Sequence, residues 1–171
     1  AHSLYIRYGD KLRQHERSVC LPEETIGSLG TANIVIMGMG RVGRGAFDAL
    51  RDAGHQDVVG VEEKYAVALE RSGNGWPCVH GDASDRDFWE HTQLVNCELI
   101  MVSLSNHREN LRVAKLAREL DFQNTLAVSV RFPDEAAELE ALGCATVYLY
   151  QDVGRDFATH ALNKLTAELS R

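Results

Sequence analysis

Three glycines directly after a short apolar run have the spacing of a phosphate-binding turn. Gly38, Gly40 and Gly43 give the pattern G-x-G-x-x-G after the apolar residues Ile34 to Met37. In such a turn the first glycine allows a tight bend, the second leaves room for a pyrophosphate, and the third lets a helix lie close to the strand. The free N–H groups at the start of that helix favour an anion at the same point. The pattern predicts a nucleotide-binding turn; an ordinary strand-to-helix turn is the alternative.

An acidic residue follows at the separation at which it can reach a ribose. Glu62 comes after a second apolar run, Val58 to Val61, about 20 residues beyond the glycines. A carboxylate there accepts hydrogen bonds from both ribose hydroxyls and repels a 2′-phosphate. The position therefore favours NAD or an AMP-like ligand over NADP. The alternative is a solvent-facing acid after a strand.

Two further turns carry groups that could contact the rest of a nucleotide. The turn Gly81-Asp82-Ala83-Ser84-Asp85 offers a small residue for an adenine ring and a carboxylate for its exocyclic amine. An ordinary turn with a helix cap is an equal alternative there. Ser103 and Ser105 lie at the end of a fourth apolar run, which is where doubly wound sheets bind their ligands.

No residue has the surroundings of a catalytic group or of a metal ligand. His107 lacks a nucleophile or a second carboxylate at a recognisable spacing, so we expect an ordinary helix residue. The four cysteines and seven histidines are scattered, without the spacing of a zinc site. We therefore predict no catalytic residue, no bound metal, and reduced cysteines as in a cytosolic compartment.

Strands alternating with helices must position these residues. Apolar runs predict strands at 34–37, 58–61, 76–80, 99–104, 125–130 and 145–150, with helices between them. Such alternation indicates βαβ units, and right-handed crossovers then give a Rossmann-type α/β fold. We expect a doubly wound parallel sheet of six strands in the order 3-2-1-4-5-6. A last helix from Asp152 carries an apolar stripe that we expect to pack on the core, although it could also meet a second subunit: Val153, Phe157, Ala161, Leu162, Leu165 and Leu169.

Length and charge limit the architecture and the partners. The chain has 171 residues, of which 44% are hydrophobic, so one domain with a full core is expected. We assign residues 32–171 to this domain and residues 1–31 to a basic helix and linker. A net charge of −7 argues against a nucleic-acid partner, whose phosphates need a basic surface. No run reaches the roughly 18 apolar residues of a membrane span.

The amino-terminal segment suggests a piece of a longer protein. The chain begins at Ala1 without an initiator methionine or a signal-peptide pattern. Residues 1–18 hold four basic and two acidic side chains. One reading is a solvated helix that packs its tyrosines on the domain. The other is a cytoplasmic linker that leaves a membrane helix, where lysine and arginine accumulate on the inner side.

Six segments, taken in order, carry a resemblance to a known family. They are I-V-I-M-G-M-G-R-V-G at 34–43, Glu62, G-D-A-S-D at 81–85, S-L-S at 103–105, E-N-L at 109–111, and V-R-F-P-D-E-A-A-E-L-E-A-L-G at 130–143. In this order they resemble the TrkA-N domains, also called RCK N-lobes. The chain is most similar to the carboxyl-terminal domain of Kef-type potassium efflux systems, which are cation/proton antiporters. The resemblance covers about residues 33–170.

The resemblance implies a cytoplasmic regulatory domain, without enzymatic activity, at the inner face of the cell membrane. It would bind NAD(H) or AMP, form a homodimer, and act on a membrane-embedded cation transporter domain of the same chain or of a partner subunit; glutathione is a possible further ligand. The matched positions place the phosphates at the glycine turn, the ribose at Glu62, the adenine at Asp82 and Ala83, and the inner edge of the ligand at 103–105. The implied binding residues are Gly38, Met39, Gly40, Arg41, Val42, Gly43, Glu62, Glu63, Lys64, Asp82, Ala83, Ser103, Leu104, Ser105, Arg108 and Arg131.

Two points qualify this expectation. Many relatives carry A-R-x-R where this chain has Val128-Ser129-Val130-Arg131, so one of two basic groups is missing. A small NAD-dependent oxidoreductase is the alternative function, but no Tyr-x-x-x-Lys or comparable proton-donating pair supports it.

For the dimer, we expect pairing through apolar residues of the helices after the fourth and fifth strands: Leu111, Ala114, Leu120, Leu139 and Leu142.

Overall fold

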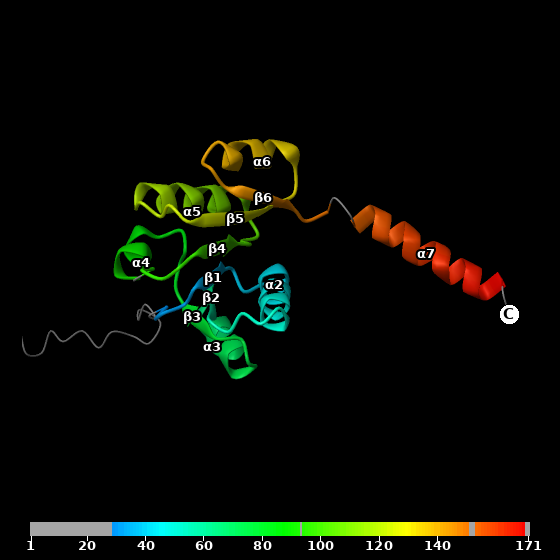
Figure 1. The fold of residues 1–171 in the computed structure, drawn as a ribbon, viewed down its shortest axis with the longest axis horizontal. Helices are drawn as coiled ribbons and strands as arrows, with labels where there is room; N and C mark the ends of the chain where they lie inside the picture. The colour runs from blue at the N-terminus through cyan, green and yellow to red at the C-terminus, as the bar shows by residue number, and fades with distance from the viewer. Residues whose placement is uncertain (1–28, 93, 151–152, 170–171) are drawn as a thin grey trace, which may run out of the picture.

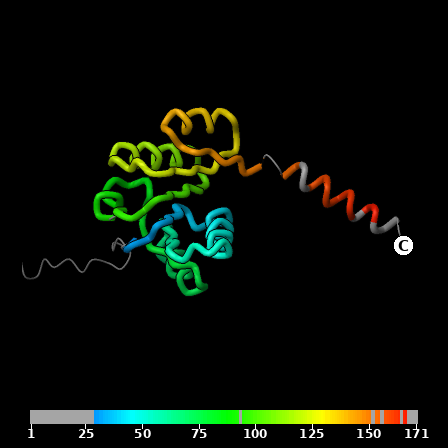
Figure 2. The backbone as a smooth tube through the Cα atoms, viewed as in Figure 1, coloured from blue at the N-terminus to red at the C-terminus, as the bar shows by residue number. Residues whose placement is uncertain are grey.

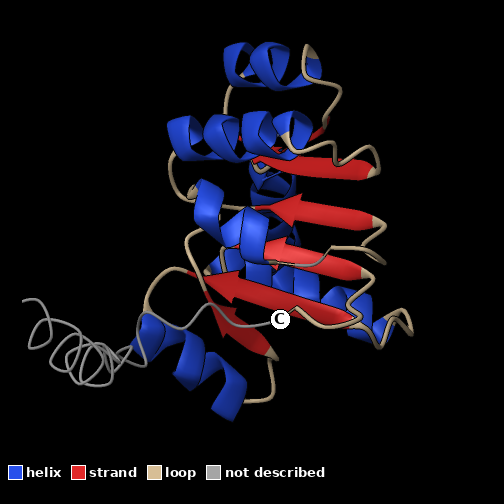
Figure 3. Cartoon of the chain, turned by 90° about the vertical axis from the view of Figure 1, so that its left-hand side faces the viewer, coloured by secondary structure: helices blue, strands red, loops and turns tan. Residues whose placement is uncertain are grey.

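One parallel sheet forms the centre of the molecule. A computed structural model describes residues 29–92, 94–150 and 153–169 (Figure 1). The six strands within these residues have the order β3-β2-β1-β4-β5-β6, and every neighbouring pair is parallel, as the aligned arrows of Figure 3 show. The predicted Rossmann-type fold and strand order are confirmed. The strands are β1 (Ile34–Met37), β2 (Val58–Glu62), β3 (Cys78–His80), β4 (Leu99–Val102), β5 (Thr125–Val130) and β6 (Ala145–Tyr148).

Helices connect the strands on both faces of the sheet. They are α2 (Arg41–Asp52), α3 (Tyr65–Gly73), α4 (Arg86–His91), α5 (His107–Glu119) and α6 (Pro133–Glu140), whereas α7 (Val153–Leu169) follows the last strand. The two successive halves of the chain, β1 to β3 and β4 to β6, lie side by side (Figure 2). They meet where β1 pairs with β4. The predicted basic helix at 1–18 and the predicted cap Asp152 lie outside the described residues.

Alternate residues of β1 enter two separate cores. Val35 and Met37 belong to the larger buried cluster, which includes residues of α4, α5 and α6. Ile34 and Ile36 belong to a smaller cluster with Phe47 of α2. All four side chains of β1 are buried, which explains why this strand reads as a continuous apolar run.

The bounds of β2, β3, β4 and β6 differ from the predictions, and those of β3 and β4 differ for local reasons. β3 begins at Cys78 because Pro77 has no N–H to donate, although its carbonyl still accepts from the Gly60 N–H at 2.8 Å. β4 ends at Val102 because the Leu104 N–H bonds to a side chain, at 3.1 Å from Asn110 Oδ1, instead of to a neighbouring strand.

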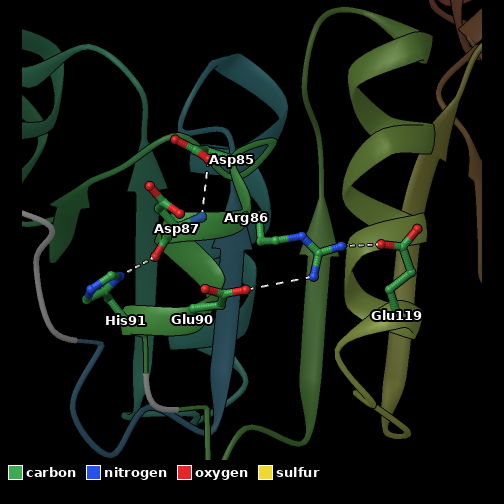
Figure 4. A network of polar contacts seen from close by, with 6 residues as sticks. All are labelled: Asp85, Arg86, Asp87, Glu90, His91 and Glu119. Atoms are coloured by element: carbon green, nitrogen blue, oxygen red, sulfur yellow. Dashed lines mark hydrogen bonds and ion pairs between the residues drawn. The ribbon is translucent and has the colours of Figure 1, made fainter.

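Side-chain caps fix where α4 and α5 begin. Asn106 caps α5, as predicted, because its Oδ1 accepts from the Arg108 N–H at 2.9 Å. Asp85 caps α4 in the same way. On the surface, Arg86 of α4 forms ion pairs with Glu90 of the same helix and with Glu119 of α5 (Figure 4). Exposed pairs of this kind contribute about 0–1 kcal/mol, so buried apolar contacts hold α4 in place.

The expectation that the last helix packs on the core is wrong. α7 projects away from the sheet (Figure 1), and the side chains of its apolar stripe that the structure describes face solvent. Phe157 is 76% exposed, and Val153, Leu162 and Leu165 are each more than half exposed. Apolar spacing marked the stripe correctly but carried no information on what covers it.

The expected pairing patch on α5 and α6 is smaller than predicted. Ala114 and Leu139 are fully buried in the protein's own core, so they are unavailable to a partner. Leu111, Leu120 and Leu142 are partly buried and pack against that core. The reason is that α5 and α6 pack against each other as well as against the sheet, which covers more of their apolar faces than one sheet face would.

Candidate functional site

An open cleft lies beyond the carboxyl ends of the strands, where β1 meets β4. The chain turns to one side of the sheet after β1 and to the other after β4, and ligands of such sheets bind at this switch point. The cleft has a volume of about 480 Å³. Its lining residues are Gly38, Gly40, Arg41, Val42, Glu62, Glu63, Lys64, Val67, Ser103, Leu104, Ser105, Glu109, Ser129, Arg131, Leu149 and Tyr150.

A smaller hollow continues the cleft toward β3. Its volume is about 60 Å³, and it shares Gly38, Glu63, Leu104 and Glu109 with the cleft. The remaining lining residues are Val61, Gly81, Asp82, Ala83 and Ser84. The fold thus brings the predicted adenine turn next to the predicted phosphate turn, although the two are far apart in sequence.

The fold requires two of the three glycines of the turn, each for a different reason. Gly38 has φ of 96°, and a Cβ there would lie 2.9 Å from Leu104 Cδ2 and 3.0 Å from the Ser103 carbonyl oxygen. A Cβ on Gly43 would overlap the Gly38 carbonyl oxygen. Gly40 differs from both, because its φ is −72° and no atom beyond its neighbours in the chain lies within 4 Å of its Cβ position. The fold itself does not need glycine at position 40, and the space left there belongs to the cleft.

Side chains from the second half of the chain hold the floor of the cleft. The Ser103 hydroxyl donates to the Gly38 carbonyl oxygen at 2.9 Å and so fixes the glycine turn, while Ser103 also lines the cleft as predicted. Asn110 is only 4% exposed. Its Oδ1 accepts from the Leu104 N–H, and its Nδ2 donates to the Ser129 carbonyl oxygen at 3.3 Å. Asn110 therefore ties the end of β4 to the end of β5.

Met39 contributes only its backbone to the turn. Its side chain is fully buried and lies against Gly60 of β2, where a Cβ would overlap the methionine. The Met39 carbonyl oxygen accepts from Arg71 Nε of α3 at 3.3 Å. The prediction that Met39 lies in the turn holds, but its side chain points into the core and not toward the cleft.

Charged side chains of both signs surround the cleft. Arg41, Lys64 and Arg131 are basic, whereas Glu62, Glu63 and Glu109 are acidic. Glu62 Oε1 accepts from the Lys64 N–H at 3.3 Å. Arg131 Nη2 donates to the Ser105 carbonyl oxygen at 2.7 Å, which holds the guanidinium over the loop before α5. Such a mixed lining suits a ligand that carries phosphates at one end and hydroxyl donors at the other.

Three predicted residues, Met39, Gly43 and Arg108, line neither the cleft nor the hollow, and several lining residues were missed. Arg108 does not reach the cleft; it lines a separate groove along α5. Its neighbour Glu109 lines both the cleft and the hollow. The position of Glu109 in the first turn of a helix after the fourth strand was the available signal for it. Val67, Ser129, Leu149 and Tyr150 join the cleft from α3 and from the second half of the sheet, and no local pattern marks them.

The described cysteines are poor nucleophiles. Burial raises the pKa of the Cys78 thiol to about 12 and that of Cys97 to about 11, and it also raises the pKa of Cys144. All three thiols are therefore protonated near neutral pH, whereas nucleophilic attack needs the thiolate.

In residues 29–92, 94–150 and 153–169, no cluster of histidine, cysteine, aspartate or glutamate could hold a metal ion. No helix in those ranges combines the length and apolarity of a membrane span.

Comparisons with known proteins identify relatives of the chain. The family model of the TrkA-N domain matches residues 34–149. The potassium uptake protein TrkA of the Trk system from Streptomyces coelicolor is 30% identical over 117 residues, which are 67% of this chain and 52% of that protein. The chain thus spans about half the length of this curated relative.

Solved structures show the same fold at low identity. The NAD(P)-binding domain of an exopolyphosphatase-related protein from Archaeoglobus fulgidus has a TM-score of 0.67 and 21% identity, covering 77% of this chain and 98% of that one. The Kef CTD from Shewanella denitrificans in AMP-bound form has a TM-score of 0.64 and 18% identity, covering 81% of each chain. The GsuK channel bound to NAD has a TM-score of 0.64 and 22% identity, covering 90% of this chain and 27% of that one.

Proposed function

The chain belongs to the TrkA-N domain family, and on that premise we propose that it senses an adenine nucleotide and regulates a potassium transport system. The ligand is NAD(H) or AMP, and the domain carries out no reaction on it. It acts on a membrane-embedded cation transporter domain, in the same chain or in a partner subunit, from the cytoplasmic face of the membrane. We assign that transporter to potassium efflux or potassium/proton antiport.

The open space at Gly40 carries this proposal. Gly38 and Gly43 are explained by the fold, whereas Gly40 has an ordinary φ and no neighbour at its Cβ position. The residue caps the amino end of α2, where free N–H groups face the cleft. A phosphate at that point accounts for the glycine, because it needs both the N–H groups and the absence of a side chain.

The rest of the nucleotide follows from the position of the phosphates. Glu62 lies at the end of the neighbouring strand β2, where it accepts from ribose hydroxyls. The base then continues into the hollow beside Ala83. On the other side of the phosphates, Ser129, Arg131 and Tyr150 leave room for the second half of NAD. The Kef CTD structure contains AMP and the GsuK channel structure contains NAD, which supports AMP and NAD as the two candidate ligands.

Titration calorimetry of AMP and NAD into the domain tests the proposal. We expect saturable binding of both. Absence of heat for either nucleotide at millimolar concentration would contradict the sensor assignment. Incubation with NADH and a panel of aldehydes and ketones tests the claim that no reaction occurs: the absorbance of NADH should stay constant, and its decay would instead support an oxidoreductase.

Glu62 should determine the preference for NAD over NADP. We expect Glu62→Gln to weaken AMP and NAD by about 1–3 kcal/mol, because a charge-assisted hydrogen bond to the ribose is lost. NADP should bind more tightly than before, because the repulsion of its 2′-phosphate is removed. Calorimetry with all three nucleotides measures this, and Glu98→Gln, at the opposite end of the sheet before β4, is the matched control. A wild-type domain that already prefers NADP would exclude this role of Glu62.

We further propose that the domain works as a homodimer in which α7 takes part. Its apolar stripe faces solvent in a single copy, and an exposed stripe of this kind is typical of an interaction surface. A nucleotide regulates such a dimer by binding one arrangement more tightly than another, with typical coupling of about 1–3 kcal/mol.

Charge placed on α7 should separate the dimer without unfolding the domain. Phe157→Glu and Leu162→Glu change side chains that are exposed in the single copy, so the core is unaffected. Light scattering at micromolar concentration should show a dimer for the wild type and a monomer for these variants. Val95→Glu, at a position 85% exposed and distant in sequence from α7, should remain dimeric. A wild type that is monomeric with and without nucleotide would contradict the proposal.

A further inference from the structure

Glu109 is an unengaged carboxylate at the junction of the cleft and the hollow. It is exposed, it lines both spaces, and within the described residues its carboxylate has no hydrogen-bond or ion-pair partner. Two neighbouring acids, Asp82 and Glu62, are engaged. Asp82 Oδ1 accepts from the Ser84 N–H at 2.7 Å and so shapes its own turn. Glu62 Oε1 accepts from the Lys64 N–H. Neither packing in the buried core nor a hydrogen bond or ion pair on the surface explains why Glu109 lines the hollow.

The backbone that carries Glu109 is held more firmly than that of the other free acid. The next residue, Asn110, is buried and bonded to Leu104 and Ser129, and Asn106 caps the same helical turn. Glu109 is therefore presented by a fixed turn of α5. Glu63 also lines both spaces, but it lies between β2 and α3, outside any helix or strand. A rigid support is what a specificity-determining group requires.

The lining of the hollow suits the edge of a base that donates hydrogen bonds. Its apolar side consists of Val61, Ala83 and Leu104, against which a flat ring can lie. Its charged side chains are carboxylates only, so within the described lining nothing charged can donate to the ring. An exocyclic amine on the ring would find acceptors on this side, and a ring without one would leave them unpaired.

We propose that Glu109 reads the exocyclic amine of the adenine base and is the main source of base specificity at this site. This inference rests on the proposed nucleotide site and assigns the main reading of the base to Glu109, which among the described residues has both carboxylate oxygens free, whereas Oδ1 of Asp82 is engaged in its own turn. The ribose at Glu62 and the phosphates at Gly40 leave the hollow as the place for the base. The carboxylate of Glu109 accepts from the amine, and Ala83 supports the ring.

The test compares AMP with purine riboside 5′-monophosphate, which is AMP without the exocyclic amine. Calorimetry measures both ligands against wild type, Glu109→Leu and the matched control Glu63→Leu, which removes the same charge from the same two spaces. We expect wild type to prefer AMP by about tenfold, as for one hydrogen bond to a charged group. Glu109→Leu should reduce this ratio to near one, mainly through weaker AMP binding, and Glu63→Leu should retain it.

Other outcomes separate this inference from the proposed function. AMP binding with an unchanged ratio in Glu109→Leu overturns the role of Glu109 and leaves the nucleotide site intact. If the preference for AMP is lost in Glu63→Leu but kept in Glu109→Leu, then Glu63, in the loop between β2 and α3, recognises the base. That result also overturns the role proposed for Glu109. A wild-type domain that binds neither ligand overturns the proposed function, and the inference with it. Thermal unfolding of both variants shows that they are folded; both altered side chains are at the surface.

Discussion

Replacing Gly40 with valine is expected to abolish nucleotide binding while the domain remains folded. The backbone at position 40 has a φ open to any residue, and no atom beyond its neighbours in the chain lies within 4 Å of the new Cβ. The valine side chain would instead occupy the phosphate space and shield the N–H groups of α2. Calorimetry should show that AMP and NAD bind about a hundredfold more weakly or not at all, as expected when hydrogen bonds worth about 3 kcal/mol are lost.

A matched control lies on the same helix. Gly45 is exposed and also has no atom beyond its chain neighbours and its own helix backbone within 4 Å of its Cβ position, but it does not line the cleft. Gly45→Val should therefore bind nucleotide as the wild type does. If Gly40→Val folds and binds AMP with unchanged affinity, the phosphates are not at this turn. In the native gene, the same substitution should remove the response of potassium flux to the nucleotide.

Replacing Gly43 with alanine is expected to destabilise the fold by about 3 kcal/mol, near the upper end for an overpacked site. The new Cβ would overlap the Gly38 carbonyl oxygen, which is a backbone atom and cannot move to another rotamer. To remove this overlap, α2 would have to move away from β1. That movement would open the smaller core around Phe47. Urea unfolding followed by circular dichroism measures the loss.

The control for this prediction is again position 45. Gly45→Ala should stabilise the domain by about 0.5–1 kcal/mol, because alanine is the better helix former at an open, exposed site. A Gly43→Ala protein that unfolds at the wild-type urea concentration would show that α2 can shift at little cost. The contact between turn and helix would then not be the reason for the glycine.

Local sequence was sufficient for the elements and for their order. Continuous apolar runs predicted the buried strands, and the glycine spacing located the junction of β1 and α2 within one residue. The rule that crossovers are right-handed then left few topologies. Prediction was less accurate at strand ends, because the partners of residues such as Leu104 are side chains contributed by later segments.

The parts that could not be predicted depend on contacts between distant segments. The Ser103 hydroxyl was expected at the cleft because it follows a strand, but its hydrogen bond to the Gly38 carbonyl oxygen was not predicted. Met39 was expected in the turn, and only the absence of a Cβ on Gly60 explains why its side chain turns inward. Neither pairing leaves a mark on the sequence near the residue concerned.

Helix rotation explains why Arg108, one of the expected binding residues, lines a different groove. Arg108 and Glu109 are consecutive, so their side chains point about 100° apart around α5. The binding residues implied by the family resemblance included Arg108. The direction in which α5 leaves β4 puts Glu109 at the cleft and Arg108 in the outer groove. That direction is set by packing against β5 and α6 and cannot be read from the helix itself.

The hydrogen bond between Ser103 and Gly38 has a consequence for the order of folding. It joins residues 65 positions apart, and β1 lies between β2 and β4, so the cleft does not exist until both halves of the chain have met. Contacts this distant form late, because the intervening loop must first be closed. A nucleotide therefore has nothing to bind in a half-folded chain. It should slow the unfolding rate in proportion to its affinity and leave the refolding rate unchanged, so that ligand prolongs the lifetime of the finished domain without hastening its formation.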